Sequence, residues 1–213
     1  MTIVELEKVS KSYGDKNVLN NLSFKIEEGT FNVIMGASGS GKSTILNIIG
    51  LLDKATSGDV ILFGQKNIRP FSMKAEQMLK NKIGYLFQNF ALIENETVAN
   101  NLKLALENVR GNKKEKISVA LKEVGLEGYE NKKIFKCSGG EQQRVAIARL
   151  LLKPCELILA DEPTGSLDIK NREIVVKLLK NMQEQGKTII VVSHDPFFEA
   201  IADNVIDLSA NIK

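Results

Sequence analysis

The 213-residue sequence has no tryptophan, one histidine, two cysteines and four prolines. Two cysteines are too few to staple a small fold with disulfides, and without an export signal they are most simply read as reduced thiols in a cytosol. A single histidine also argues against a metal site built from a cluster of histidine and cysteine ligands. The sequence therefore favours neither a disulfide scaffold nor a metal site built from a cluster of such ligands.

Long hydrophobic runs are also missing. The most apolar stretches, 45–52 and 157–160, are far shorter than the ~18 residues of a membrane-spanning helix. The N-terminus carries Glu5 and Glu7 where a secretory signal has a basic start and an apolar run. We therefore expect neither a signal peptide nor a transmembrane helix in this chain.

The composition is that of an ordinary globular protein, with 43% hydrophobic and 26% charged residues. Lysine and arginine exceed aspartate and glutamate by only three, giving a net charge of +3. This excess is too small to indicate a nucleic-acid-binding protein by itself. The length favours one domain with an insertion over two full domains.

Hydrophobic patterning predicts a layered α/β fold. Alternation over 4–9 and 18–26 indicates two half-buried strands at an antiparallel edge. Short apolar runs indicate central parallel strands covered on both faces; they are 31–35, 83–87, 157–160 and 188–192. Helical patterns lie between them, at 44–52, 98–109, 113–124, 139–152 and 169–185. Because 89–153 contains no convincing strand, we expect a helical insertion there, within a core of 1–88 and 154–213.

A glycine-rich motif follows the first of these apolar runs. It reads Gly36, Ala37, Ser38, Gly39, Ser40, Gly41, Lys42, Ser43. This is the phosphate-binding loop pattern, and its place between a strand and a helix directs backbone N–H groups and the helix dipole at one anion. Lys42 is expected to reach the β- and γ-phosphates, and the Ser43 hydroxyl is suited to Mg²⁺.

Two carboxylates end the apolar run at 157–160. Asp161 and Glu162 are followed by Pro163, which prevents the strand from continuing. Buried carboxylates are costly unless they bind cations or act in catalysis. We therefore expect Asp161 to support Mg²⁺ or its water, and Glu162 to polarise an attacking water.

A third motif, Ser138-Gly139-Gly140-Glu141, opens a helix. A serine cap followed three residues later by glutamate is a capping box, and locally the plain helix start is the favoured interpretation. The alternative is a phosphate site, because the two glycines leave backbone amides facing outward.

Together these motifs resemble, in order and spacing, the ATP-binding cassette of ABC transporters over essentially the whole chain. The resemblance rests on 36–43, on Cys137 to Arg144, on 157–163, on 166–168 and on His194. It implies an α/β P-loop NTPase fold with a mixed central sheet, an antiparallel β edge subdomain and a helical insertion. It also identifies Ser138-Gly139-Gly140 as the signature, which contacts ATP bound to the other cassette of a head-to-tail dimer.

The same resemblance assigns roles to residues that say little alone. Tyr13 is the aromatic residue that stacks on adenine, Gln88 touches Mg²⁺ and the attacking water, and His194 contacts the γ-phosphate. Ser166 and Asp168 belong to a loop that communicates across the dimer. The ATP site implied comprises Tyr13, Gly36, Ala37, Ser38, Gly39, Ser40, Gly41, Lys42, Ser43, Thr44, Ser138, Gly139, Gly140, Ser166 and Asp168. The catalytic set is Glu162, His194, Gln88 and Lys42, and the metal set is Ser43, Gln88 and Asp161.

The signature departs from the family pattern at two positions. Cys137 stands where leucine is usual, and Glu141 stands where glutamine is usual. Cysteine can serve as a small hydrophobe, as leucine does. Glu141 is able to reach back to the cap amide as glutamine would, but its negative charge near the γ-phosphate is expected to weaken ATP-driven closure.

The resemblance implies ATP and Mg²⁺ as cofactors, a second copy and an integral-membrane permease as partners, and no nucleic acid. The expected place is the cytoplasmic face of the cell membrane. The stretches 46–53, 83–90 and 161–168 are similar to those of macrolide-exporter, lipoprotein-release and bacteriocin-export cassettes. The cargo class is then a peptide, bacteriocin, antibiotic or lipoprotein.

Two other functions remain open at this stage. One is a soluble ABC ATPase acting on nucleic acid, although the segment from Lys42 to Cys137 is too short for the long coiled coil of chromosome-maintenance proteins. The other is a nonhydrolysing scaffold that uses ATP to control partner docking. The presence of Glu162 and His194 argues against it.

Overall fold

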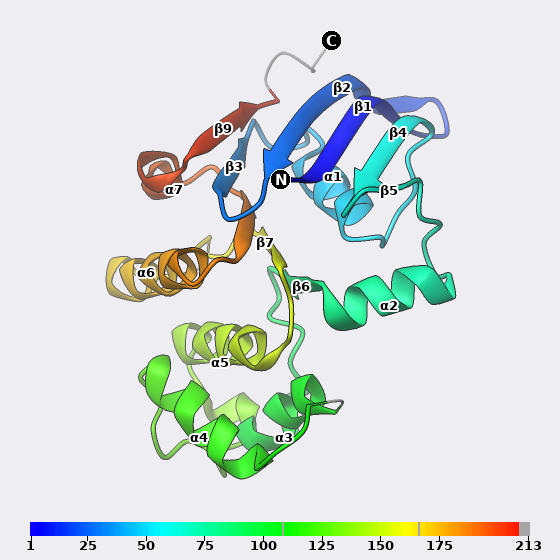
Figure 1. The fold of residues 1–213 in the computed structure, drawn as a ribbon. Helices are drawn as coiled ribbons and strands as arrows, with labels where there is room; N and C mark the ends of the chain where they lie inside the picture. Colours follow the sequence, from blue (N-terminus) through cyan, green and yellow to red (C-terminus); the bar gives the residue numbers. More distant parts are fainter. Residues whose placement is uncertain (108, 166, 209–213) are drawn as a thin grey trace.

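The computed structural model describes residues 1–107, 109–165 and 167–208. The strands are β1 (Thr2–Tyr13), β2 (Lys16–Glu27), β3 (Phe31–Met35), β4 (Ser57–Leu62), β5 (Gln65–Lys66), β6 (Ile83–Leu86), β7 (Leu157–Asp161), β8 (Thr188–Val192) and β9 (Asn204–Asp207). They form two sheets (Figure 1). One is antiparallel with the order β2-β1-β4-β5, and the other is parallel with the order β6-β7-β8-β3-β9.

The helices lie between and beside these sheets, and those of residues 89–153 form a group below them in Figure 1. They are α1 (Lys42–Ile49), α2 (Met73–Asn81), α3 (Val98–Lys103), α4 (Lys113–Glu123), α5 (Gly139–Leu152), α6 (Ile169–Glu184) and α7 (Pro196–Ile201), with the 3₁₀ turns η1 (Leu104–Leu106) and η2 (Ile134–Lys136). Along the described part of the chain, no helix combines the length and the apolar character that crossing a bilayer requires.

The parallel sheet is buried on both faces. Successive side chains of a strand point to opposite faces, so Leu157 and Leu159 of β7 pack in one hydrophobic cluster and Ile158 and Ala160 in the other. The first cluster contains α1 and the antiparallel sheet, and the second contains α3 to α7. This double burial explains why the central strands are continuous apolar runs.

Helix α1 lies between the two sheets. Its side chains Ile45, Leu46 and Ile49 are fully buried, in one cluster with residues of β1 and of β8. An amphipathic helix normally hides one face, whereas this one is covered from both sides. The glycine-rich loop that precedes α1 is therefore attached to a helix held firmly within the core.

The structure confirms the predicted fold class, with the parallel and antiparallel pairings in two separate sheets rather than in one. Within 89–153 the described residues form helices and turns, with one isolated bridge between Thr97 and Lys133. The helix predicted over 98–109 is shorter than expected, because α3 ends at Lys103 and continues as the 3₁₀ turn η1. That residues 89–153 form a separate helical subdomain inserted in the core stays a prediction.

Candidate functional site

Four chain segments meet at one edge of the parallel sheet. The loop at 36–41 follows β3, Gln88 lies just after β6, Asp161 ends β7, and His194 lies just after β8. The register pairs Ala160 with Val191, and β8 lies between β7 and β3. Because the carboxyl ends of parallel strands share an edge, the fold gathers the predicted residues there, where ligands of open α/β sheets bind.

The loop backbone requires glycine at specific positions. Gly39 and Gly41 have φ values of +81° and +91°, in the left-handed region. A Cβ on Gly41 would also lie 2.6 Å from Leu19 Cδ2 of the antiparallel sheet. Among the α-helices of the described residues, α1 alone begins without a side-chain cap. Its first-turn amides are therefore left to bind an anion.

Lys42 points back into the loop that precedes it. Its ammonium donates hydrogen bonds to the carbonyls of Gly36 at 2.7 Å and Ala37 at 3.0 Å. These neutral acceptors hold the cation at the loop, where phosphate oxygens would be stronger acceptors. Ser38 lies exposed, Ser40 is buried, and Thr44 lies in the first turn of α1.

Ser43 connects the loop with β7. Its hydroxyl donates to Asp161 Oδ1 at 3.1 Å. Burial raises the pKa of the Asp161 carboxyl, with a further contribution from Glu162, and the Ser43 hydrogen bond and Lys42 oppose this only in part. A half-buried carboxylate that pays a desolvation cost next to a serine hydroxyl has the features of a cation ligand.

Glu162 and His194 face each other at the same edge. Glu162 Oε1 lies 3.0 Å from His194 Nδ1, and the Ser193 hydroxyl donates to Glu162 Oε2 at 3.3 Å. The side chain of Glu162 is 16% exposed, whereas that of His194 is 73% exposed. The backbone of Glu162 has φ = +43°, a strained value for a residue other than glycine. Such strain is typical of functional positions.

Gln88 is exposed beyond the end of β6. The ladder with β7 ends at the pair of Leu86 with Ala160, and Gln88 lies in the turn that follows. Arg149 of α5 donates to the carbonyls of Phe90 at 2.8 Å and Ala91 at 2.5 Å, in the turn after Gln88. The helical part and the strand edge are thus tied together at this turn.

Tyr13 is the last residue of β1 and is 49% exposed. Its hydroxyl donates to Asp53 Oδ2. The Lys11 ammonium donates to Asp53 Oδ1 at 2.6 Å and lies 4.6 Å from the centre of the Tyr13 ring. The hydrogen bond to Asp53 and then burial raise the pKa of the Tyr13 phenol, against a smaller opposing effect of the Thr44 hydroxyl. The ring is therefore anchored by Asp53 beside the first turn of α1.

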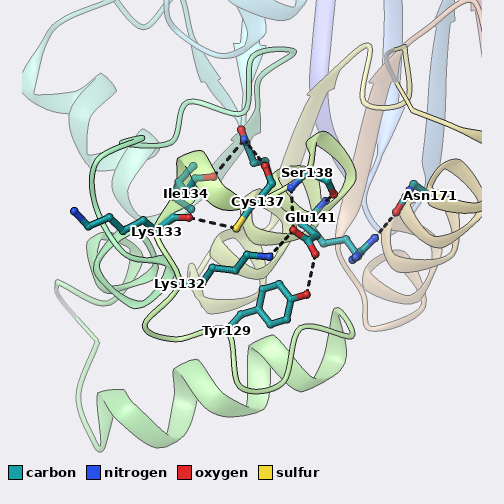
Figure 2. A network of polar contacts seen from close by, with 10 residues as sticks. Tyr129, Lys132, Lys133, Ile134, Cys137, Ser138, Glu141 and Asn171 are labelled. Atoms are coloured by element: carbon teal, nitrogen blue, oxygen red, sulfur yellow. Dashed lines mark hydrogen bonds and ion pairs between the residues drawn. The ribbon is translucent and has the colours of Figure 1, made fainter.

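The Ser138 turn is a complete capping box (Figure 2). The Glu141 amide donates to Ser138 Oγ at 3.3 Å, and the Ser138 amide donates to Glu141 Oε2 at 2.9 Å. Among the described residues, Ser138 is bonded to Glu141 and Gln142 of its own helix and to nothing in the loop at 36–43. Open space faces the position of a Cβ on Gly139. The capping box is therefore confirmed, and the interpretation as a phosphate site stays a prediction. The space is open at Gly139 only, because a Cβ on Gly140 would lie 2.5 Å from Asn171 Cγ.

Asp168 caps α6 and connects it with α5. Its Oδ1 accepts from the Asn171 amide, and its Oδ2 accepts from Asn171 Nδ2, both at 2.8 Å. Asn171 Oδ1 in turn accepts from Arg144 Nη1 (Figure 2). The chain of contacts therefore runs from the Asp168 loop to the Ser138 helix. Ser166, predicted for the same loop, lies outside the described residues.

The sequence analysis missed several residues that hold the site. Asp53 and Lys11 position Tyr13, Arg149 holds the turn after Gln88, and Lys132 pairs with Glu141. Their partners are distant in sequence or separated by a turn, and no spacing rule points to them. For Lys132, the sequence offers one signal, the basic run NKKIFK at 131–136.

Comparisons with known proteins agree on one family. A family model described as "ABC transporter" matches residues 19–165. The macrolide export ATP-binding/permease protein MacB of Mannheimia succiniciproducens is 40% identical over 98% of this chain, which covers 33% of that protein. The spermidine/putrescine import ATP-binding protein PotA of Mycoplasma capricolum is 42% identical over 91% of this chain and 54% of its own length. The chain thus spans between a third and about half of the length of these relatives.

Solved structures agree with this result. The ATP-binding cassette MJ0796, in a dimeric post-hydrolysis state bound to ADP and Pi, superposes with a TM-score of 0.89 at 40% identity, covering 98% of this chain and 95% of that one. The cbiO1 protein of Clostridium perfringens, part of the transporter complex cbiONQ, superposes with a TM-score of 0.82 at 29% identity, covering 97% and 84%.

Proposed function

Because the chain belongs to the ABC transporter family and is an ATP-binding cassette of this family of ATPases, we propose that it hydrolyses Mg-ATP at the edge described above and thereby powers a separate membrane permease. The observation that carries the proposal is the adjacency of two contacts, Ser43 with Asp161 at 3.1 Å and Glu162 with His194 at 3.0 Å. The contact of Ser43 with Asp161 has the character of a cation site. The contact of Glu162 with His194 joins the proposed base to the proposed phosphate-binding histidine.

The triphosphate binds along the glycine-rich loop. Amides of 36–41 and of the first turn of α1 donate to its oxygens, and Lys42 exchanges the carbonyls of Gly36 and Ala37 for the β- and γ-phosphates. The Tyr13 ring, anchored by Asp53, stacks on the adenine. Thr44 completes the first turn, whose amides face the anion.

The residues present fit a magnesium ion. The Ser43 hydroxyl, the Asp161 carboxylate and the Gln88 amide are hard oxygen ligands, and the raised pKa of Asp161 reflects a half-buried carboxylate without a full cationic partner. Magnesium, when bound with the nucleotide, neutralises phosphate charge. In sites of this kind it is typically held by one or two carboxylates together with substrate phosphates.

Glu162 acts as the general base. Its carboxylate orients a water for attack on the γ-phosphate and accepts a proton from it, while His194 contacts the γ-phosphate and Lys42 offsets the developing negative charge. Gln88, in the turn after β6, positions the water and reports the state of the site to the permease.

The site is completed by a second copy of the chain. Ser138, Gly139 and Gly140 of one subunit contact the γ-phosphate of ATP held by the other, and Ser166 and Asp168 communicate across the interface. The open space at Gly139 supports this arrangement. Among the described residues, Ser138 also makes no hydrogen bond to the glycine-rich loop of the same subunit. Hydrolysis removes the phosphate that bridges the subunits, so the dimer opens.

The transported cargo is a peptide, bacteriocin, antibiotic or lipoprotein, and the direction is export or extraction. The macrolide export relatives align over 90 to 98% of the chain and the import relative over 91%, so the coverage does not separate the two directions. The similarity of the stretches 46–53, 83–90 and 161–168 to exporter cassettes is what supports export. The cassette then works at the cytoplasmic face of the cell membrane, held there by the permease. Residues 89–153 form the helical part, which contains the signature and moves with it.

The test uses Glu162→Gln, because general-base help is worth about 10² to 10⁴ in rate. We expect the variant to bind ATP normally, to hydrolyse it hardly at all, and to elute as a dimer with Mg-ATP in size-exclusion chromatography. A monomer under these conditions would contradict the sandwich dimer, in which each bound ATP lies between the two subunits.

Co-purification of the cassette from membranes should then retain a permease. Retention of DNA or RNA in its place would indicate the nucleic-acid ATPase, and the absence of phosphate release even from the permease complex would indicate the scaffold.

A further inference from the structure

Glu141 of the signature turn has three polar partners, which Figure 2 shows converging on its carboxylate. Oε2 accepts from the Ser138 amide at 2.9 Å and from the Lys132 ammonium at 2.9 Å. Oε1 accepts from the Tyr129 hydroxyl at 2.8 Å. The side chain of Glu141 is only 18% exposed, so these bonds form in a partly desolvated place. Both oxygens of the carboxylate therefore accept hydrogen bonds.

Lys132 is held as firmly as Glu141. Its side chain is 30% exposed, and its ammonium lies 4.2 Å from the centre of the Tyr129 ring. The ring and the carboxylate therefore fix the cation from two sides. By contrast, the ammoniums of Lys133 and Lys136 lie 5.9 and 5.8 Å from the exposed Phe135 ring. Of these three lysines in the basic run, Lys132 is the one whose side chain is bonded to the signature.

The ionisation of Glu141 reflects the same contacts. Partial burial on its own raises the pKa of this carboxyl, but the hydrogen bonds from Lys132, the Ser138 amide and Tyr129 outweigh it and leave the pKa below its ordinary value. Glu141 is thus an anion at neutral pH. Without a partner it would place a negative charge one helical turn from the serine and glycines that face the γ-phosphate.

The capping box separates two sets of amides. It engages those of Ser138 and Glu141, and the first helical amides, of Gly139 and Gly140, are left to a ligand because such groups have no acceptor within the helix. Like charges repel, so a carboxylate behind these amides opposes the approach of a phosphate. A lysine bound to that carboxylate cancels the opposition without moving the cap.

We propose that Lys132 is a positioning residue of the signature, which neutralises Glu141 so that the Ser138 turn presents a neutral surface to the γ-phosphate held by the partner. The proposal rests on the sandwich dimer of the proposed function. It corrects the simple expectation that glutamate at this position weakens closure, because the chain supplies the compensating charge nine positions earlier in the sequence.

The test measures the ATP concentration at half-maximal dimer formation in the Glu162→Gln background, by analytical ultracentrifugation. Lys132→Met leaves Glu141 uncompensated, and this concentration should rise about threefold to tenfold, since each dimer contains two such turns. Glu141→Gln leaves the positive charge of Lys132 uncompensated and should lower the ATP concentration at half-maximal dimer formation. The double variant should return close to the starting value.

The opposite effects expected for Lys132→Met and Glu141→Gln distinguish an electrostatic role from a structural one. If Lys132 and Glu141 served only to cap and pack the helix, Glu141→Gln would keep the cap and would not strengthen the dimer, and this outcome would overturn the proposal. Lys132→Arg keeps the charge and should behave as the parent, and raising the salt concentration should shrink both effects. Lys136→Met is the matched control, since it removes a neighbouring lysine that is not bonded to the signature.

The same experiment keeps the two proposals apart. If the Glu162→Gln parent does not dimerise with Mg-ATP, the sandwich itself fails. If the parent dimerises and Lys132→Met leaves the ATP dependence unchanged at an unchanged thermal midpoint, the sandwich stands and the role of Lys132 is refuted.

Discussion

The carboxylate of Glu162 lies 3.0 Å from the Nδ1 atom of His194, although the two residues follow different strands. Strands β7 and β8 are neighbours, and the Glu162 amide donates to the Val192 carbonyl at 2.9 Å. The strand pairing therefore brings Glu162 and His194 together. This contact links the residue that would activate water to the one that would contact the γ-phosphate.

We predict that His194→Ala lowers kcat for ATP hydrolysis about 10²-fold, because one preorganised polar contact to the transition state is lost. The dissociation constant for ATP should change little. The His194 side chain is 73% exposed, so the thermal midpoint should stay nearly constant. Steady-state phosphate release and calorimetry of unfolding provide the measurements. Glu199→Ala, which removes another exposed side chain after β8, serves as the control and should retain full activity.

Asp161→Asn should stabilise the nucleotide-free protein at neutral pH. The pKa of this carboxyl is raised in the folded state, so the unfolded chain loses the proton more readily and stability falls as pH rises through the folded value. The variant avoids this loss, and its thermal midpoint should be about 1 to 3 °C higher at pH ~7. The advantage should shrink as the pH approaches the ordinary value of 3.8.

Mg-ATP should reverse the order of the two proteins. The parent should gain stability from the nucleotide by mass action, and Asp161→Asn should gain less because a ligand of the cation is missing. A variant that is less stable than the parent without nucleotide at neutral pH would refute the desolvation argument.

Asp53→Ala should weaken the binding of ATP through the orientation of Tyr13. The hydroxyl of Tyr13 loses its acceptor, the ring is no longer fixed, and stacking on a base is worth about 1 to 3 kcal/mol. Binding of ATP, measured by calorimetry, should therefore weaken about threefold to tenfold. Binding of inorganic tripolyphosphate should not change, since it has no base.

A matched control exists on the same sheet. Asp59 is also paired with a lysine, Lys66, and with an asparagine, but on the surface of β4. Asp59→Ala should leave both affinities intact. Equal losses for ATP and tripolyphosphate in Asp53→Ala would show that the phosphate loop itself was disturbed.

Gly84→Ala should loosen the junction of β6 with α5. A Cβ there would lie 2.8 Å from Leu150 Cδ2 and 2.9 Å from the Cys155 sulfur, inside a packed core. Overpacking of this kind costs about 1 to 3 kcal/mol, measurable by urea unfolding. The double variant Gly84→Ala, Cys155→Ala should recover part of the loss because the sulfur is removed. Full stability of the single variant would mean that the junction adapts freely.

Several elements could be predicted only in part. The buried strands β3, β7 and β8 agree with the apolar runs, because burial on both faces leaves an unbroken pattern. Strands β4, β5 and β9 and helices α2 and α7 were not predicted. Strand β9 is mostly exposed, and its partner is β3, so its pairing depends on the completed sheet. In β4, Gly58 and Asp59 interrupt the alternation that indicates a strand.

The amino-acid pattern alone determined the chemistry, because a glycine loop with lysine and serine, and a strand that ends in two carboxylates, have local physical requirements that spacing reveals. Tertiary structure decided which distant side chains contact the residues of these motifs. Only parallel pairing brings Ser43 to Asp161, only the contact of the β1 end with the segment after α1 anchors Tyr13 on Asp53, and only the packing of the helical part places Lys132 on Glu141. Hydrogen bonds and charge pairs act over a few ångströms in space, whereas sequence patterns report neighbours along the chain.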